Sequence, residues 1–325
     1  MASFESINAG FDKIFRPGAL SLGIVVPIEN YDQGPIPTMK DHQRRVQLID
    51  ELGFKALWIR DIPLNVPAFG DAGQLFDPFT YLGFLAGHTH SISLGVSSIA
   101  LPLHHPLHVA KAAASVDQLS NGRMILGVAS GDRPQEYPAL NVEFENRDER
   151  FREAFHYLRK THYSFPTFTS THFGEINGQM DLLPKPTSSK IPLLMTGSSR
   201  QTLEWNAKHA DGWMNYPRNL YQQKVTIETY RSLVSQHSSF DKPFMQPLYL
   251  DLHSNDDFRP QPIHLGFRIG INHLVEYLHQ CEGIGVNHLA FNLRFNQLDI
   301  EETLEKLAKE VLPHFHQIQK TTLTA

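Results

Sequence analysis

The sequence predicts a (β/α)₈ barrel, a TIM barrel of the α/β class with long insertion loops, formed as a single domain by residues 1–325. Strand-like apolar segments alternate strictly with helical patterns, and no series of hairpins interrupts them. The segments are apolar throughout, as expected for parallel strands that are buried on both faces. A doubly wound open sheet is the competing architecture.

The clearest repeating unit extends from Leu94 to Gly131. An apolar segment is followed by helical spacing of apolar residues over 106–119, and Asn121-Gly122 stops that helix. A second apolar segment then ends in small residues. Because parallel strands need a crossover connection of about this length, the unit indicates two neighbouring parallel strands joined by a helix.

Eight strands and eight helices are expected in this alternation. The expected strands are residues 20–26, 56–59, 94–100, 124–128, 191–195, 212–215, 244–252 and 288–293. The expected helices are residues 43–52, 78–87, 106–119, 150–161, 201–208, 220–235, 272–282 and 300–316. Gly53, Gly122 and Gly285 each lie between a helix and the next strand, where a glycine commonly ends a helix.

Three segments do not belong to this alternation. Residues 1–19 form an N-terminal extension that is expected to place a short helix over the bottom of the barrel. The long loop 162–190 is expected to contain a hairpin that turns at Asn177-Gly178 and to form a lid over the site. The second long loop, 253–266, is polar and contains prolines.

Composition argues against several classes of partner. The formal net charge is −5, with 41% hydrophobic and 19% charged residues, so attraction to nucleic acid or to an anionic membrane is not expected. No uncharged apolar segment reaches the roughly 20 residues that span a bilayer. The one cysteine, Cys281, cannot form an internal disulfide, and no signal-peptide pattern is present, so a cytoplasmic protein is expected.

The residues that follow the expected strands are mostly small or hydroxyl-bearing, and few are acids, bases or nucleophiles. Such a site suits a bound cofactor that supplies the reactivity. Asp61 is the one acid that we nominate as a catalytic candidate, because it lies at a strand end that faces the expected cavity. The alternative is that Asp61 caps a turn or pairs with Arg60.

The segment from Thr196 to Thr202 joins a strand to a helix and offers consecutive backbone N–H groups, hydroxyls and a cation. This arrangement is typical of phosphate binding. The alternative is an ordinary capping box in which Ser198 and Gln201 satisfy the donors of the helix itself.

Other motifs are not found. The 18 histidines include no metal-binding spacing, so no metal site is predicted. His105 is expected to satisfy backbone groups at a helix start, and Cys281 is expected in the core. The sequence contains neither the G-x-S-x-G motif of hydrolases nor a nucleotide-binding glycine motif.

Five stretches carry a resemblance to a known family: residues 51–61, 77–131, 136–154, 182–213 and 282–293. On these stretches the chain resembles the bacterial luciferase-like monooxygenases, (β/α)₈ barrels that use reduced FMN or the deazaflavin F420. The resemblance covers the chain from the first expected strand to the last expected helix.

The resemblance implies a set of cofactor-binding residues. A non-proline cis peptide is implied at Ser97-Ser98, against which the flavin ring rests. The phosphate site is implied at Ser199 and Thr202, with backbone donors from Ser198 to Arg200 and with Arg150. The remaining implied flavin neighbours are Ala129, Ser130, Asn215 and Tyr216.

Two positions depart from the bacterial luciferases. This chain has Asp61 where they carry a histidine, and Ala129 where they carry a reactive cysteine. Both differences count against light emission.

The resemblance implies an FMN-dependent monooxygenase or oxidoreductase that acts on a small organic substrate with O₂. The reduced FMN would come from a separate flavin reductase, and a homodimer is expected. Two alternatives stay open: an F420-dependent oxidoreductase and a non-catalytic flavin-binding protein.

Overall fold

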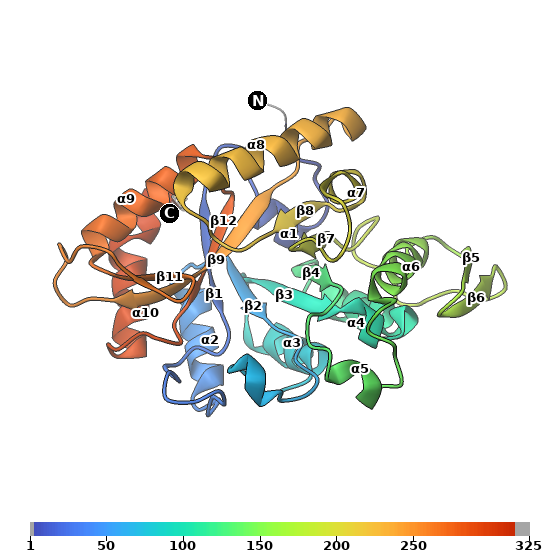
Figure 1. The fold of residues 1–325 in the computed structure, drawn as a ribbon, viewed down its shortest axis with the longest axis horizontal. Coiled ribbons are helices and arrows are strands. Elements are labelled where there is room, and N and C mark those ends of the chain that lie inside the picture. The colour runs from blue at the N-terminus through green and yellow to red at the C-terminus, as the bar shows by residue number, and fades with distance from the viewer. Residues whose placement is uncertain (1–2, 316–325) are drawn as a thin grey trace, which may run out of the picture.

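Parallel strands ringed by helices make up most of the computed structural model, which describes residues 3–315 (Figure 1). The barrel strands are β1 (Ser21–Val25), β2 (Ala56–Ile59), β3 (Ser93–Ala100), β4 (Met124–Ala129), β7 (Leu193–Thr196), β8 (Gly212–Met214), β9 (Phe244–Leu252) and β12 (His288–Asn292). The helices between them are α2 (His42–Glu51), α3 (Pro78–His88), α4 (Pro106–Leu119), α6 (Arg147–Lys160), α7 (Leu203–His209), α8 (Leu220–His237), α9 (Ile271–Gly283) and α10 (Ile300–Glu310).

The barrel is closed. Hydrogen-bonded neighbours follow the order β9-β12-β1-β2-β3-β4-β7-β8, and β8 pairs with β9 to complete the ring. All of these pairs are parallel. The predicted TIM barrel is therefore confirmed, and the open doubly wound sheet is wrong.

Each expected strand and helix is present, with shifted ends. The largest shift at a helix start is in α6, which begins at Arg147 rather than at residue 150. The expected helix 300–316 is divided into α10 and the short α11 (Leu312–Phe315), and its expected end at residue 316 lies outside the described residues. Gly53, Gly122 and Gly285 have φ values of 90°, 80° and 98°, so the predicted glycine helix ends are confirmed.

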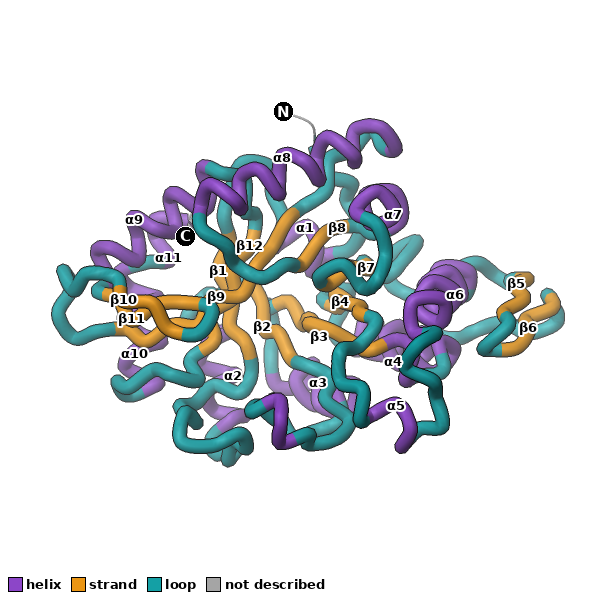
Figure 2. Tube along the Cα trace, in the orientation of Figure 1, coloured by secondary structure: helices purple, strands orange, loops and turns teal. Residues whose placement is uncertain are grey.

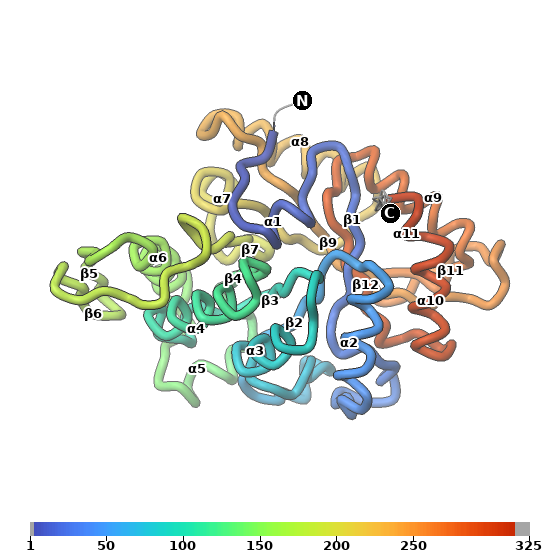
Figure 3. Tube along the Cα trace, turned by 180° about the vertical axis from the view of Figure 1, so that it is seen from behind, coloured from blue at the N-terminus to red at the C-terminus, as the bar shows by residue number. Residues whose placement is uncertain are grey.

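The N-terminal extension places α1 (Ala9–Ile14) at the amino ends of β3 and β4, as expected (Figure 3). The Gly10 amide donates to the Gly122 carbonyl over 2.8 Å, and the Ser93 hydroxyl donates to the Gly10 carbonyl over 3.1 Å. A Cβ atom at Gly10 would lie 2.6 Å from the Arg123 carbonyl oxygen, so only glycine permits this close approach. This helix closes the bottom of the barrel.

The first long loop contains an antiparallel hairpin of β5 (Thr167–Ser170) and β6 (Gly174–Asn177). Its turn is at residues 171–173, so the predicted turn at Asn177-Gly178 is wrong. The Gly178 amide instead donates to the Pro166 carbonyl over 3.1 Å at the open end of the hairpin. The hairpin projects beyond α6, at the right edge of Figure 1.

The second long loop also forms a hairpin, of β10 (Gln261–Ile263) and β11 (Gly266–Ile269), and β11 pairs with the end of β9 (Figure 2). Strand β9 has nine residues, so its second half is long enough to pair with β11. A Cβ atom at Gly266 would lie 1.8 Å from the Tyr249 carbonyl oxygen, so this pairing requires glycine.

Three short helices complete the fold: η1 (Pro67–Phe69), η2 (Leu101–Leu103) and α5 (Glu136–Ala139). Within residues 3–315, none of the helices has both the length and the apolar character that crossing a bilayer requires.

Candidate functional site

A cleft with about 1650 Å³ of empty space, its open mouth included, lies at the carboxyl ends of the barrel strands. It is lined by the ends of β2, β3, β4 and β7 and by the loops that follow them. Arg60, Ser97, Thr196, Tyr216 and Tyr249 line both this cleft and an inner cavity of about 670 Å³ inside the barrel. The two spaces are therefore adjacent parts of one site.

The peptide bond between Ser97 and Ser98 is cis, so this prediction is confirmed. The regular register between β3 and β4 is interrupted between Val96 and Ile99, which places both serines outside the ladder. The Ser97 hydroxyl donates to the Ile59 carbonyl over 3.4 Å. Both serines line the cleft.

Ala129 and Ser130 also line the cleft, at the end of β4. The Tyr137 hydroxyl donates to the Ser130 carbonyl. Gly131 follows with a φ of 73°, and a Cβ atom there would lie 2.9 Å from the Tyr137 hydroxyl oxygen. Short side chains therefore line this wall and leave the cleft open.

The loop after β7 turns sharply at the cleft wall. Gly197, Ser199 and Arg200 have φ values of 57°, 45° and 59°, and the Ser199 hydroxyl donates to the Thr196 carbonyl over 2.8 Å. Within residues 3–315, the backbone amides of Ser198 and Ser199 have no protein acceptor. Residues Ser198, Ser199 and Arg200 all line the cleft, so these two amide donors lie beside it.

The capping-box interpretation of this loop is wrong. Thr202, not Ser198, is the N-cap of α7, and its hydroxyl oxygen accepts from the Trp205 amide over 3.0 Å. The Gln201 side chain instead donates to the Asp148 carbonyl over 2.9 Å and accepts from Arg152 over 3.1 Å. These bonds tie the loop to α6, and Thr202 is not among the residues that line the cleft.

The structure does not bring Arg150 to the cleft either. Its guanidinium carbon lies 4.7 Å from the Phe173 ring centroid, and its Nε donates to the Pro102 carbonyl over 3.4 Å. The early start of α6 places Arg147 at the cleft instead, stacked 3.4 Å from the Phe144 ring centroid. Sequence reasoning missed Arg147 because the family resemblance implied Arg150, three residues later on the same helix.

Two guanidinium groups at the cleft retain free donors. Nε of Arg147 and Nη1 of Arg133 are buried, and neither has a hydrogen-bond partner within the described residues. Both residues line the cleft. Buried donors of this kind favour an anionic ligand, because leaving them unpaired costs free energy.

Asp61 lines the cleft, but its carboxylate is already engaged. Oδ2 lies 2.7 Å from Nε2 of His104 and accepts from the Ala100 amide over 3.1 Å, so the proposed pairing with Arg60 is wrong. Burial lowers the pKa of His104, but the hydrogen bond and charge of Asp61 outweigh burial and leave this pKa raised. The pair ties the end of β2 to the end of β3.

Arg60 pairs with Asp71 instead, through N–O distances of 2.9 and 3.2 Å. Arg294 reaches the same carboxylate at 3.2 Å, and Tyr31 accepts from Arg60 over 3.1 Å. Burial raises the pKa of Asp71, but the two arginines and a backbone hydrogen bond outweigh burial and lower it overall. Sequence reasoning missed this network, because its members come from loops that are distant in the chain.

Asn215 and Tyr216 lie at the end of β8, as predicted. Asn215 lines the inner cavity, and its side-chain oxygen accepts from the Tyr216 amide over 2.9 Å. The Tyr216 side chain lines both spaces.

The prediction that loop 162–190 covers the site is wrong, because no residue of that loop lines the cleft. The rim comes instead from residues 131–147 and from the β10–β11 turn, which contributes His264 and Leu265.

The comparisons with known proteins agree with this fold. The model of the luciferase-like monooxygenases matches residues 20–256. The alkanal monooxygenase beta chain of Photorhabdus luminescens is 28% identical over 169 residues, which cover 51% of this chain and 50% of that protein. The match thus spans about half the length of this relative.

Two solved structures are similar in fold. An F420-dependent secondary alcohol dehydrogenase in complex with an F420-acetone adduct has a TM-score of 0.72 at 15% identity, covering 90% of this chain and 98% of that chain. The oxygenating constituent of 3,6-diketocamphane monooxygenase from Pseudomonas putida, in complex with FMN, has a TM-score of 0.72 at 14% identity, covering 91% and 98%.

Proposed function

Because this chain belongs to the luciferase-like monooxygenase family, we propose that it is an oxidoreductase that uses reduced FMN and O₂ to oxygenate a small organic substrate. The observation that carries the proposal is the cleft, which combines the small residues Ser97, Ser98 and Ala129 with the amides of Ser198 and Ser199 that have no acceptor within the described residues.

The residues of the cleft suit a flavin phosphate. A phosphate accepts several hydrogen bonds, and the amides of Ser198 and Ser199, Nε of Arg147 and Nη1 of Arg133 make no hydrogen bond within the described residues. Nη1 of Arg133 lies 4.0 Å from Oε1 of Glu136. We propose Arg147 as the arginine of α6 that contacts this group. The roles of Thr202 and Arg150 in cofactor binding stay predictions.

When bound, reduced FMN would supply the electrons with which O₂ is activated. The small residues Ser97, Ser98 and Ala129 would leave room for a flat ring, and Trp58, Met214 and Met245 give the inner cavity an apolar wall. This wall would keep water away from the reacting atoms. Arg60, held by Asp71, is the cation at the junction of the two spaces and would orient a polar group of the substrate.

An F420-dependent oxidoreductase is the second candidate. Its support is the F420-acetone complex among the structures of similar fold. A separate flavin reductase as the source of reduced FMN, and a homodimer, complete the proposal.

Parallel titrations test the choice of cofactor. The full chain is titrated with FMN, with reduced FMN under anaerobic conditions and with F420, and binding is followed by fluorescence. We expect one FMN site per chain. Preferential binding of F420 would replace FMN by the second candidate, and binding of neither cofactor would refute both.

Turnover separates an enzyme from a flavin-binding protein. Oxygen consumption is measured with enzymatically reduced FMN in the presence of a panel of small ketones, aldehydes and aromatic compounds. Substrate-dependent product formation is expected. Tight FMN binding with no effect of any candidate on oxygen use would favour the non-catalytic alternative.

A further inference from the structure

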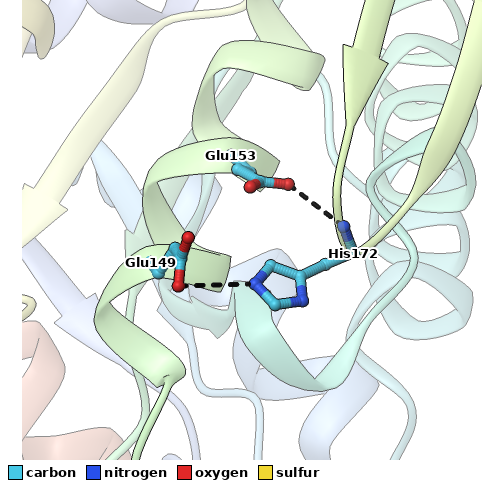
Figure 4. Close-up of side chains that lie close together, drawn as sticks. All are labelled: Glu149, Glu153 and His172. Atoms are coloured by element: carbon cyan, nitrogen blue, oxygen red, sulfur yellow. Dashed lines mark hydrogen bonds and ion pairs between the residues drawn. The ribbon is translucent and has the colours of Figure 1, made fainter.

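Three potential metal ligands meet where the β5–β6 hairpin packs against α6 (Figure 4). Glu149 and Glu153 lie one turn apart on the same face of α6, and His172 lies in the turn of the hairpin. One ligand atom of each residue lies within 4.8 Å of those of the other two. None of the three residues lines the cleft, so this cluster is separate from the proposed cofactor site.

The imidazole of His172 is the most informative member. Its Nε2 atom is buried and has no hydrogen-bond partner within residues 3–315. The nearest acid oxygen is Oε2 of Glu149 at 3.8 Å, which is too long for a hydrogen bond. Zinc binds histidine nitrogen and carboxylate oxygen at about 2.0–2.2 Å, so two ligands of one ion lie roughly 3–4 Å apart. The observed separation suits an ion between the two atoms.

Glu153 is held in place by the hairpin. Its Oε2 accepts from the Ser170 hydroxyl and from the His172 amide, the latter over 3.2 Å. Hydrogen bonds of this kind orient carboxylate ligands in metal sites.

Neither carboxylate has a lysine or arginine partner within the described residues. Arg150 lies between them in sequence, but its guanidinium stacks on Phe173. Two neighbouring carboxylates and an imidazole nitrogen that makes no hydrogen bond within the described residues therefore face one another.

We propose that Glu149, Glu153 and His172 bind a divalent transition-metal ion that fastens the β5–β6 hairpin to α6. An imidazole with two carboxylates favours Zn²⁺ or a similar transition metal over Mg²⁺ and Ca²⁺, which prefer oxygen ligands alone. Water would complete the coordination, because Glu149 is exposed to solvent. No sequence motif marks this site, because its ligands come from two elements that only the fold brings together.

Titration of the metal-free full chain with ZnCl₂, followed by calorimetry, tests the site. We expect one Zn²⁺ ion per chain, and at least a tenfold loss of affinity in His172→Ala and in Glu149→Gln. Glu175→Gln is the matched control, because Glu175 lies on the same hairpin, is exposed and is outside the cluster. Absence of Zn²⁺ binding would overturn the proposal, as would unchanged binding in the double variant of Glu149 and His172.

Two further measurements guard against a folding artefact and against binding by other histidines. Circular dichroism should be the same for Glu149→Gln and the unmodified chain, because the exposed Glu149 carboxylate makes no hydrogen bond to the hairpin. Zn²⁺ should slow proteolysis within residues 162–190 in the unmodified chain and in Glu175→Gln but not in His172→Ala. Equal protection in all three would contradict the proposal.

Discussion

Arg123 at the amino end of the barrel differs from two arginines that line the cleft at its carboxyl end. At the amino end, the Arg123 guanidinium donates five hydrogen bonds: to the carbonyls of Ser120, Ile92, Ala86 and Thr89 and to the Thr89 hydroxyl. At the carboxyl end, Arg133 and Arg147 are half-buried, and each retains a buried nitrogen without a hydrogen-bond partner within the described residues. The hydrogen bonds of Arg123 hold the framework together, whereas Arg133 and Arg147 line the cleft.

The same contrast holds for backbone groups. At the amino end, Gly10, Ser93 and Gly122 hydrogen-bond α1 to the barrel, whereas at the carboxyl end the amides of Ser198 and Ser199 have no acceptor within the described chain. Amides beside an open cleft can donate to a ligand without first breaking a protein hydrogen bond. The carboxyl end therefore keeps donors available for an anionic ligand.

The largest effect is expected at the amino end. Arg123→Ala leaves several buried carbonyls without a donor, so it should reduce the free energy of unfolding by at least about 3 kcal/mol. Urea unfolding measures the loss. The folded fraction should bind FMN with unchanged affinity. Weaker FMN binding at unchanged stability would show that Arg123 acts on the cleft rather than on the framework.

A smaller effect, on binding rather than stability, is expected at the carboxyl end. Arg147→Ala removes a charged donor from the cleft and should weaken FMN binding by about 2 kcal/mol, or roughly 30-fold in Kd. Arg150→Ala is the matched control from the same helix, because Arg150 packs on Phe173 away from the cleft. If Arg150→Ala weakened FMN binding more than Arg147→Ala, Arg150 would be the phosphate ligand that the family resemblance implied.

The smallest effect is expected at the Asp61–His104 pair, and it depends on pH. Since Asp61 raises the pKa of His104 above its ordinary 6.5, the pair contributes most below that value, and its contribution is lost as pH rises through the raised pKa. Asp61→Asn should therefore cost about 1.5 kcal/mol at pH 6 and less at pH 9. Unfolding free energies at both pH values measure this difference. An equal cost at both would show that protonation of His104 does not contribute to the stability of the pair.

Most of the barrel was predictable because its signals are local. The apolar segment before Ala129 and the glycines that end helices depend on neighbours in the chain, and all have their expected positions. The cis peptide at Ser97-Ser98 came from family resemblance, which carries information that spacing does not.

Two errors and one rejected alternative share a physical cause. The turn at Asn177-Gly178 was inferred from a turn dipeptide, the lid over the site from loop length, and the alternative capping role of Ser198 from local spacing. Contacts between distant segments decided them otherwise: Gln201 bonds to α6, and the hairpin packs beside α6 instead of crossing the cleft.

The sequence by itself determined the alternation of strands and helices, and with it the barrel and the end at which its cleft lies, because burial periodicity and chain reversal are local properties. Only the tertiary structure decided which side chains meet there. Arg147 rather than Arg150 lines the cleft, His104 holds Asp61, and Glu149, Glu153 and His172 converge. These contacts depend on where helices start and where loops run, because a shift of a few residues turns a side chain to another face.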